Sequence, residues 1–243
     1  MFDSHLSELV MMAAPIVLIA YLVRGVCGFG SGLIAIPVLS LLFPLKVAVP
    51  LVVMLDYLAS AGQGVSLRQS IQWGEIRRLI IPALIGVSTG LLIFHKVDAG
   101  LLTRFLGGFV FLYALYALWG PEMPRVSSWW AVPAAISGGA VGTLFGTGGP
   151  FYVTYLKARQ LDKNAFRATF ACIFLLDGAA RVTGYVSTEV VDIQLLVLLA
   201  MSLPVMILGM YLGGKIHTSL SAEVFTRGIS ILLLASGASL MLR

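Results

Sequence analysis

Charged side chains are scarce in this sequence, since Asp, Glu, Lys and Arg together make up only 11% of its 243 residues. Soluble domains carry roughly 25% charged residues, so the composition excludes an ordinary soluble domain. Hydrophobic residues reach 59% instead. At about 20 apolar residues for each crossing, the spans leave no room for a soluble catalytic domain. The composition predicts an integral membrane protein that crosses the bilayer several times.

Cysteine and histidine are almost absent as well, with two and three copies. Cys27 and Cys172 both lie in apolar stretches, which excludes a disulfide framework and a zinc site, and we expect no metal and no other cofactor. An intramembrane serine protease built on Ser31 would lack a base, because the histidines lie outside the centres of the predicted spans. We therefore expect no enzyme. The basic residues occur in short clusters between apolar runs, which indicates membrane orientation and not nucleic-acid binding.

Stretches without charged residues mark what the bilayer accepts, because a charge at mid-helix costs roughly 2.5 to 3.5 kcal/mol on insertion scales. They predict transmembrane helices over 79–95, 104–119, 192–213 and 226–242, and over two stretches with charged residues inside them, 47–66 with Asp56 and 168–186 with Asp177 and Arg181. Two further stretches, 9–43 and 128–156, are too long for one crossing, and each has a cluster of glycines in its middle. Glycine and proline interrupt helices, so each of these stretches predicts a helical hairpin with its tip inside the membrane.

The chain also contains an internal repeat. Phe-Gly-Ser-Gly at 29–32 recurs as Phe-Gly-Thr-Gly at 145–148, an offset of 116, and Leu-Asp at 55–56 recurs at 176–177, an offset of 121. Further matches follow in the same order, up to Thr-Arg at 103–104 and 226–227, an offset of 123. Transporters are often built from two such halves. We predict two repeats, 1–125 and 126–243, each a glycine-broken hairpin plus three transmembrane helices.

Charge in equivalent loops indicates that the two repeats are inverted. The loop 66–78 is basic, whereas its counterpart in the second half holds Glu189 and Asp192 and no basic residue. Cytoplasmic loops are enriched in Lys and Arg. We therefore expect the loops at 66–78, 120–127, 157–167 and 214–225 in the cytoplasm and both termini outside.

The two hairpin tips are the candidate binding site. Irregular backbone at membrane depth is tolerated only where protein or a water-filled cavity surrounds it, so we expect both tips near mid-membrane. Broken helices there direct free N–H groups at a cavity, and helix N-termini bind anions. The alternative is that the glycines serve only close helix packing. The candidate substrate-binding residues are Arg24, Gly28, Phe29, Gly30, Ser31, Gly32, Phe145, Gly146, Thr147, Gly148, Gly149 and Arg181.

Two acidic residues inside predicted spans, Asp56 and Asp177, are candidates for ion coupling. Charged groups within a membrane are functional candidates, and burial favours proton uptake by a carboxylate. Asp177 and Arg181 are four residues apart on one helix and could instead form a structural ion pair. The coupling ion would be a proton or sodium, and an uncoupled channel for anions or small solutes remains the alternative.

The glycine-rich segments at 25–32 and 142–150 resemble those of the sulfite exporter TauE/SafE family, also called the toluene sulfonate uptake permeases. The resemblance covers essentially the whole chain. It implies a multi-pass secondary transporter of the cell membrane, in bacteria the inner membrane, that moves sulfite, sulfonates or similar small sulfur-containing anions. It implies no catalytic residue.

Overall fold

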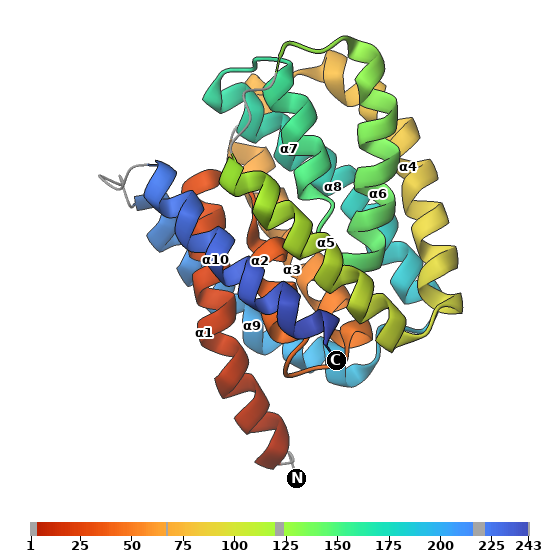
Figure 1. Cartoon of the computed structure of the whole chain (residues 1–243), viewed down its shortest axis with the longest axis vertical. Coiled ribbons are helices and arrows are strands. Elements are labelled where there is room, and N and C mark those ends of the chain that lie inside the picture. Colours follow the sequence, from red (N-terminus) through yellow and green to blue (C-terminus); the bar gives the residue numbers. More distant parts are fainter. Residues whose placement is uncertain (1–3, 67, 120–123, 216–221, 243) are drawn as a thin grey trace. The chain divides into compact units, whose positions relative to one another are not determined.

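The computed structural model describes residues 4–66, 68–119, 124–215 and 222–242, and every regular element in these ranges is a helix (Figure 1). The predicted all-α fold class is confirmed. The helices are α1 (Ser4–Cys27), α2 (Ser31–Leu39), α3 (Leu45–Ser66), α4 (Trp73–Lys96), α5 (Ala99–Trp119), α6 (Ala131–Phe145), α7 (Gly149–Ala158), α8 (Lys163–Ser187), α9 (Ile193–Lys215) and α10 (Ala222–Met241), with 3₁₀ turns η1 (Arg68–Ser70) and η2 (Ser128–Trp130).

Four of the described helices contain a stretch long and apolar enough to cross a membrane, namely α3, α4, α5 and α9. Shorter apolar stretches lie at Met11–Cys27 in α1 and Ser230–Met241 in α10. Many large apolar side chains on α4, α5 and α9 are exposed, as expected for helices that face lipid. Trp119 and Trp129 are exposed near helix ends, where aromatic residues favour the membrane interface.

Helix α4 begins at Trp73, whereas the charge-free stretch in the sequence begins at 79. The additional residues include Glu75 and Arg78, which form an ion pair within the first turns. A scan for charge-free stretches places a helix start too late wherever charged residues neutralise one another inside the helix.

The chain divides into two compact units. The first comprises residues 1–48, 97–122 and 194–243, and the second comprises residues 49–96 and 123–193. The first unit therefore holds the hairpin α1–α2 together with α5, α9 and α10, and the second holds the hairpin α6–α7 with α4, α8 and most of α3. Each unit combines the hairpin of one predicted repeat with helices of the other.

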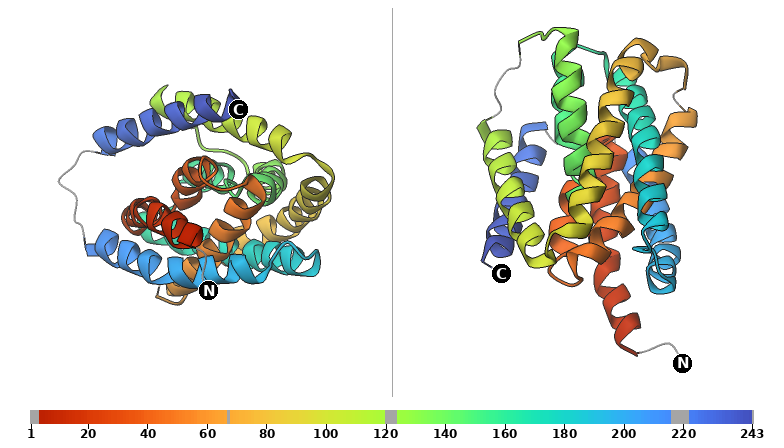
Figure 2. Two further views of the ribbon diagram at one scale, coloured as in Figure 1. Left: turned by 90° about the horizontal axis from the view of Figure 1, so that it is seen from below. Right: turned by 90° about the vertical axis from the view of Figure 1, so that its right-hand side faces the viewer.

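In the second unit, α4 and α6 touch backbone to backbone. A Cβ atom added at Gly86 would lie 2.2 Å from the Ile136 carbonyl oxygen, and one at Gly139 would lie 2.3 Å from the Ala83 carbonyl oxygen. Figure 2 shows the two helices side by side. We call this contact the α4–α6 seam. Only glycine permits so close an approach, because any Cβ would overlap the neighbouring main chain.

The first unit has a matching seam between α9 and α1. A Cβ atom added at Gly209 would lie 2.8 Å from the Leu18 carbonyl oxygen and 3.1 Å from the Leu22 nitrogen. The equivalent glycine of α4 is Gly86, 123 positions before Gly209. A Cβ atom added at Gly86 would lie close to the Ile136 oxygen and the Ala140 nitrogen. Ile136 and Ala140 lie 118 positions after Leu18 and Leu22. The same backbone atoms thus meet at constant offsets, in support of the predicted duplication.

Helices α5 and α10 cross in opposite directions within the first unit (Figures 1 and 2). The two helices approach each other most closely at a glycine of each. A Cβ atom added at Gly107 of α5 would lie 2.7 Å from the Gly237 oxygen, and one added at Gly237 of α10 would lie 2.9 Å from the Gly107 oxygen. These helices are counterparts in the predicted repeats. Antiparallel packing of counterparts is the arrangement expected from two inverted halves.

Candidate functional site

The tip of the α6–α7 hairpin is a three-residue turn between two helices. Helix α6 ends at Phe145, and Gly146 follows with φ 62°, the left-handed conformation that favours glycine. The N–H of Gly146 donates to the Gly142 oxygen at 3.0 Å, which closes α6. Helix α7 then begins at Gly149, with a proline in its first turn. The sequence therefore stops one helix and starts another within the turn.

This turn carries buried hydrogen-bond donors without acceptors. Thr147 is 1% exposed, and its hydroxyl has no partner among the described residues. The N–H groups of Thr147 and Gly148 likewise have no acceptor in the described part of the chain. The N–H of Gly149 opens α7, and the first N–H groups of a helix have no partner within the helix. Because nearly all buried polar groups in proteins are paired, these donors mark a place for an acceptor from outside the described chain.

Aromatic rings border the start of α7. A Cβ atom added at Gly149 would lie 3.7 Å from the Cζ atoms of both Phe170 and Phe174. Their rings belong to α8 and stack with centroids 4.4 Å apart. The Phe174 ring also contacts Tyr152 of α7, with centroids 5.8 Å apart, and the Arg181 guanidinium, 5.3 Å from the ring centroid. The donors of the turn therefore lie beside an apolar surface.

Behind these rings lies a fully buried ion pair. Arg181 donates from Nη2 to Oδ2 of Asp177, which confirms the pairing suggested by their spacing on one helix. The same carboxylate oxygen accepts a hydrogen bond from the Tyr152 hydroxyl at 2.8 Å. Arg181 also donates from Nη1 to the Gly142 oxygen of α6 at 3.4 Å. The pair thus joins α8 to both helices of the hairpin.

Gly142 makes room for this guanidinium. A Cβ atom added there would lie 2.9 Å from Cζ of Arg181. Next along α6, the Thr143 carbonyl accepts a hydrogen bond from the Tyr185 hydroxyl of α8. The part of α6 that precedes the tip is therefore fixed by polar groups of α8.

The tip of the α1–α2 hairpin is built on the same plan. Gly28 follows the end of α1 with φ 87°, and its N–H donates to the Arg24 oxygen at 2.6 Å. Gly30 precedes α2 with φ 101°. Arg24 and Ser31 are both buried, and Nη1 of Arg24 donates to the Ser31 hydroxyl oxygen at 3.2 Å. Of the other predicted residues, Phe29 lies half-buried in the turn and Gly32 is buried within α2.

The structure shifts the equivalence of the two tips by two residues. The sequence match pairs Phe29 with Phe145, but Phe29 lies in a turn and Phe145 ends α6. Helix α1 ends at Cys27 and helix α6 ends at Phe145, so the helix ends give an offset of 118. The same offset relates the residues of α1 and α6 that contact the seam glycines. Glycine-rich strings match one another in several registers, whereas a helix end has one position. In this register Arg24 corresponds to Gly142, so each tip has a buried guanidinium, from α1 in one hairpin and from α8 in the other.

Asp56 is buried in α3, 4% exposed, within the second unit. Helix α3 meets α8 where the Tyr57 ring lies 3.4 Å from the position of a Cβ at Gly178. Asp56 directly precedes Tyr57, and Asp177 directly precedes Gly178. The two predicted coupling acids therefore flank one helix contact. Among the described residues, no group of three or more His, Cys, Asp or Glu could hold a metal ion.

The two ends of the α6–α7 hairpin are joined at its base. The Val126 N–H, ahead of α6, donates to the Ala158 oxygen at the end of α7, at 3.2 Å. Arg159 donates from Nη1 to the Val126 oxygen at 2.9 Å. The hairpin therefore begins and ends at one place, as expected of a segment that enters and leaves the membrane on one side.

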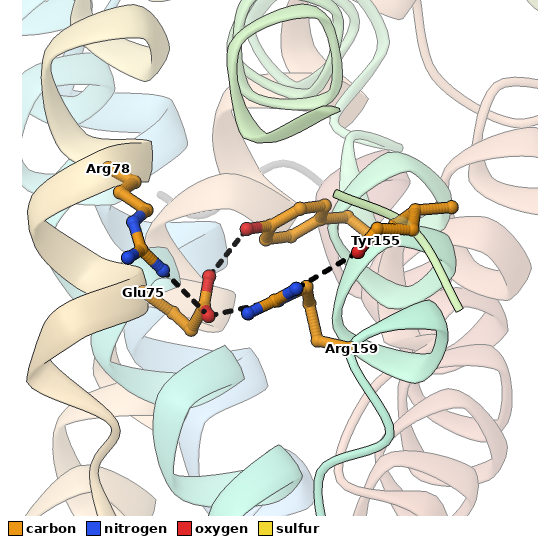
Figure 3. Close-up of polar contacts among 5 residues, drawn as sticks. Glu75, Arg78, Tyr155 and Arg159 are labelled. Atoms are coloured by element: carbon orange, nitrogen blue, oxygen red, sulfur yellow. Dashed lines mark hydrogen bonds and ion pairs between the residues drawn. The ribbon is translucent and has the colours of Figure 1, made fainter. Parts of the chain in front are cut away.

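Glu75 attaches this base to α4 (Figure 3). Its carboxylate accepts hydrogen bonds from the Tyr155 hydroxyl, from Nε of Arg159 at 3.0 Å and from Nη1 of Arg78 at 3.1 Å. We call these four residues the Glu75 cluster. Through Arg159, which also bonds to Val126, the cluster brings together chain segments from three loops that are predicted to be cytoplasmic.

Sequence reasoning missed three polar residues of this unit, namely Tyr152, Tyr155 and Glu75. A search for charged residues within spans does not consider tyrosine hydroxyls. Glu75 falls in the stretch 66–78, which the sequence predicts as a basic loop. An acidic residue in the first turn of a helix, followed by arginines, is the signal that could have identified it.

Comparison with known proteins places these features in a family. The model of a protein family described as "Sulfite exporter TauE/SafE" matches residues 13–240 of this chain. The chain is 25% identical over 199 residues to a protein of Comamonas testosteroni described as probable inner membrane transporter protein TsaS, over 78% of this chain and 81% of that protein. No solved structure matches the chain significantly. With its apolar helices, the chain is a multi-pass transport protein of the cell membrane, and it belongs to the sulfite exporter TauE/SafE family.

Proposed function

We propose that the protein is a secondary transporter that binds a small sulfur-containing anion, such as sulfite or a sulfonate, and carries it across the cell membrane. The observation that carries the proposal is the buried Thr147 hydroxyl without a partner among the described residues, next to the N–H groups of Thr147, Gly148 and Gly149 at the start of α7. The family and the Comamonas relative support transport and the sulfur-containing anion.

The chemistry of this turn suits an oxyanion. A helix N-terminus carries about half a positive charge, and its N–H groups point along the axis toward an acceptor. The Thr147 hydroxyl adds a further donor next to these groups. Gly149 is partly exposed, whereas Gly148 is buried, so a ligand reaches the donors from the α7 side. At the other tip, Arg24 and Ser31 supply a guanidinium and a hydroxyl for the same purpose.

For coupling, we propose that Asp56 carries a proton. Asp177 is held by Arg181 and Tyr152 on one oxygen, which favours a structural role for its carboxylate. Asp56 occupies the corresponding place on α3, at the contact of α3 with α8. An acidic residue inside a membrane protein is a candidate for the coupling of anion movement to a pH gradient.

The test is uptake of radiolabelled sulfite by liposomes that contain the purified protein, with and without a pH gradient. Thr147→Val keeps the side-chain shape and removes the hydroxyl, so we expect sulfite affinity to fall about ten- to a hundredfold. Thr89→Val is the matched control, because the Thr89 hydroxyl is exposed and bonds only to its own helix at Ile85. Equal sulfite affinities of Thr147→Val and Thr89→Val would show that the α7 turn is not part of the binding site.

The pH gradient separates a coupled transporter from a channel. A coupled transporter concentrates sulfite inside the liposomes when the gradient is imposed. Passage of sulfite down its own gradient, with no accumulation under any pH or sodium gradient, would instead favour an uncoupled channel.

A further inference from the structure

We infer that the α6–α7 tip takes its anion in a singly charged form and discriminates against a doubly charged anion of the same shape. The inference rests on the proposed function, since it concerns the charge of the substrate at that same turn. It follows from the balance of charges around the tip.

The charged groups in contact with this end of the hairpin compensate one another. Arg181 and Asp177 bond directly to each other and are both buried. The Nε atom of Arg181 and the Oδ1 atom of Asp177 have no hydrogen-bond partner in the described chain, which leaves one donor and one acceptor of opposite charge. The Tyr152 hydroxyl donates a hydrogen bond to Asp177, and the Tyr185 hydroxyl donates one to the Thr143 carbonyl oxygen. The ion pair beside the tip therefore contributes no net charge.

The donors at the tip are themselves neutral groups. They comprise the Thr147 hydroxyl and the N–H groups of Thr147, Gly148 and Gly149, because Pro150 has no N–H and the Phe151 N–H donates to the Gly148 oxygen. The neighbouring surface is formed by the rings of Phe170 and Phe174. The cost of removing an ion from water rises with the square of its charge, whereas its attraction to neutral donors rises only in proportion. A dianion thus meets about four times the desolvation cost for twice the attraction. The helix N-terminus carries about half a positive charge, which offsets about half the charge of a monoanion but only about a quarter of the charge of a dianion.

Methanesulfonate and methylphosphonate provide a matched pair of probes. They have the same shape, but methanesulfonate is singly charged at every working pH, whereas methylphosphonate passes from one to two charges near neutrality. We would measure their ability to compete with radiolabelled sulfite for the wild-type protein from acid to alkaline pH. Methanesulfonate also controls for any effect of pH on the protein and on the charge of the sulfite tracer, because its own charge is constant.

We expect methanesulfonate to compete equally well across the pH range. Methylphosphonate should lose at least about tenfold in affinity as it becomes a dianion, and sulfate should compete as weakly as that dianion. Equal competition by methanesulfonate and alkaline methylphosphonate would overturn the charge inference and leave the anion site intact. Failure of all the probes, with sulfite uptake also unaffected by Thr147→Val, would overturn the proposed site instead.

Two variants test the role of the ion pair. Asp177→Asn leaves the Arg181 charge unmatched, so the preference for single charge should weaken or reverse. The double variant Asp177→Asn with Arg181→Gln restores neutrality, so the preference should return. Because an unpaired buried arginine destabilises the fold, the wild-type comparison decides the inference by itself if the single variant does not fold.

Discussion

Replacement of Glu75 by Gln should destabilise the protein far more than loss of its neighbour Arg78. The Glu75 carboxylate accepts hydrogen bonds from Tyr155 and Arg159 of the hairpin and from Arg78 of its own helix. Gln keeps the shape of the side chain but removes the negative charge. Its amide group also presents a donor to partners that are themselves donors.

The magnitude follows from burial. A hydrogen bond to a charged group contributes about 1.5 to 3 kcal/mol, and loss of one member of a buried pair costs about 3 to 5 kcal/mol. The Glu75 side chain is 9% exposed and that of Arg159 is 20% exposed, so water screens this pair only in part. We expect Glu75→Gln to lower the free energy of unfolding by about 3 kcal/mol. The Arg78 side chain is 49% exposed, so Arg78→Gln should cost less than about 1 kcal/mol.

Reversible unfolding in mixed detergent micelles, followed by circular dichroism, measures both values. Sulfite binding after refolding shows that each variant regains its native structure. A loss below about 0.5 kcal/mol for Glu75→Gln, the range of ordinary surface substitutions, would refute the assignment of the Glu75 cluster as the attachment of the hairpin to α4.

Three further predictions concern the tip, the coupling and the topology. Gly148→Ala should destabilise the protein by about 1 to 3 kcal/mol in the same unfolding assay, because its Cβ would lie 2.1 Å from a carbonyl oxygen, whereas Gly108→Ala, with open space around it, should have no such effect. Asp56→Asn should abolish sulfite accumulation driven by a pH gradient and preserve sulfite exchange; accumulation at the wild-type rate would make Asp56 structural. In a background without the native cysteines, a cysteine at Lys163 should be shielded from an impermeant external thiol reagent and one at Thr188 should react, and labelling of both would contradict the inverted arrangement.

Those features of the fold that depend on local sequence were predictable. The glycine clusters and the excess length of two apolar stretches indicated helical hairpins, because they state where a helix can continue and where it cannot. The pairing of Asp177 with Arg181 followed from a spacing of four residues within one helix. In both cases, the interacting groups are close neighbours in the sequence.

Contacts between distant segments were not predictable in this way. Tyr155 bonds to Glu75 across 80 positions, and no local pattern relates the two residues. The register of the two tips was misplaced by two residues, because Phe-Gly-x-Gly strings match without reference to helix ends. The position of Gly28 and Gly146 after a helix, both with positive φ, is a property of the backbone and not of residue identity alone.

The α4–α6 seam has a mechanical consequence. Where main chain touches main chain, no side chain can change rotamer to accommodate a slide, and a displacement of one residue would bring a branched side chain such as Val87 to a place that holds only hydrogen. The register is therefore fixed, and the Glu75 cluster attaches the base of the hairpin to α4. Because Asp177, Arg181 and Tyr185 bond α8 to the hairpin, a conformational change during transport would move α4, α6, α7 and α8 as one rigid body, with the bending confined to the segments that connect this body to the rest of the chain.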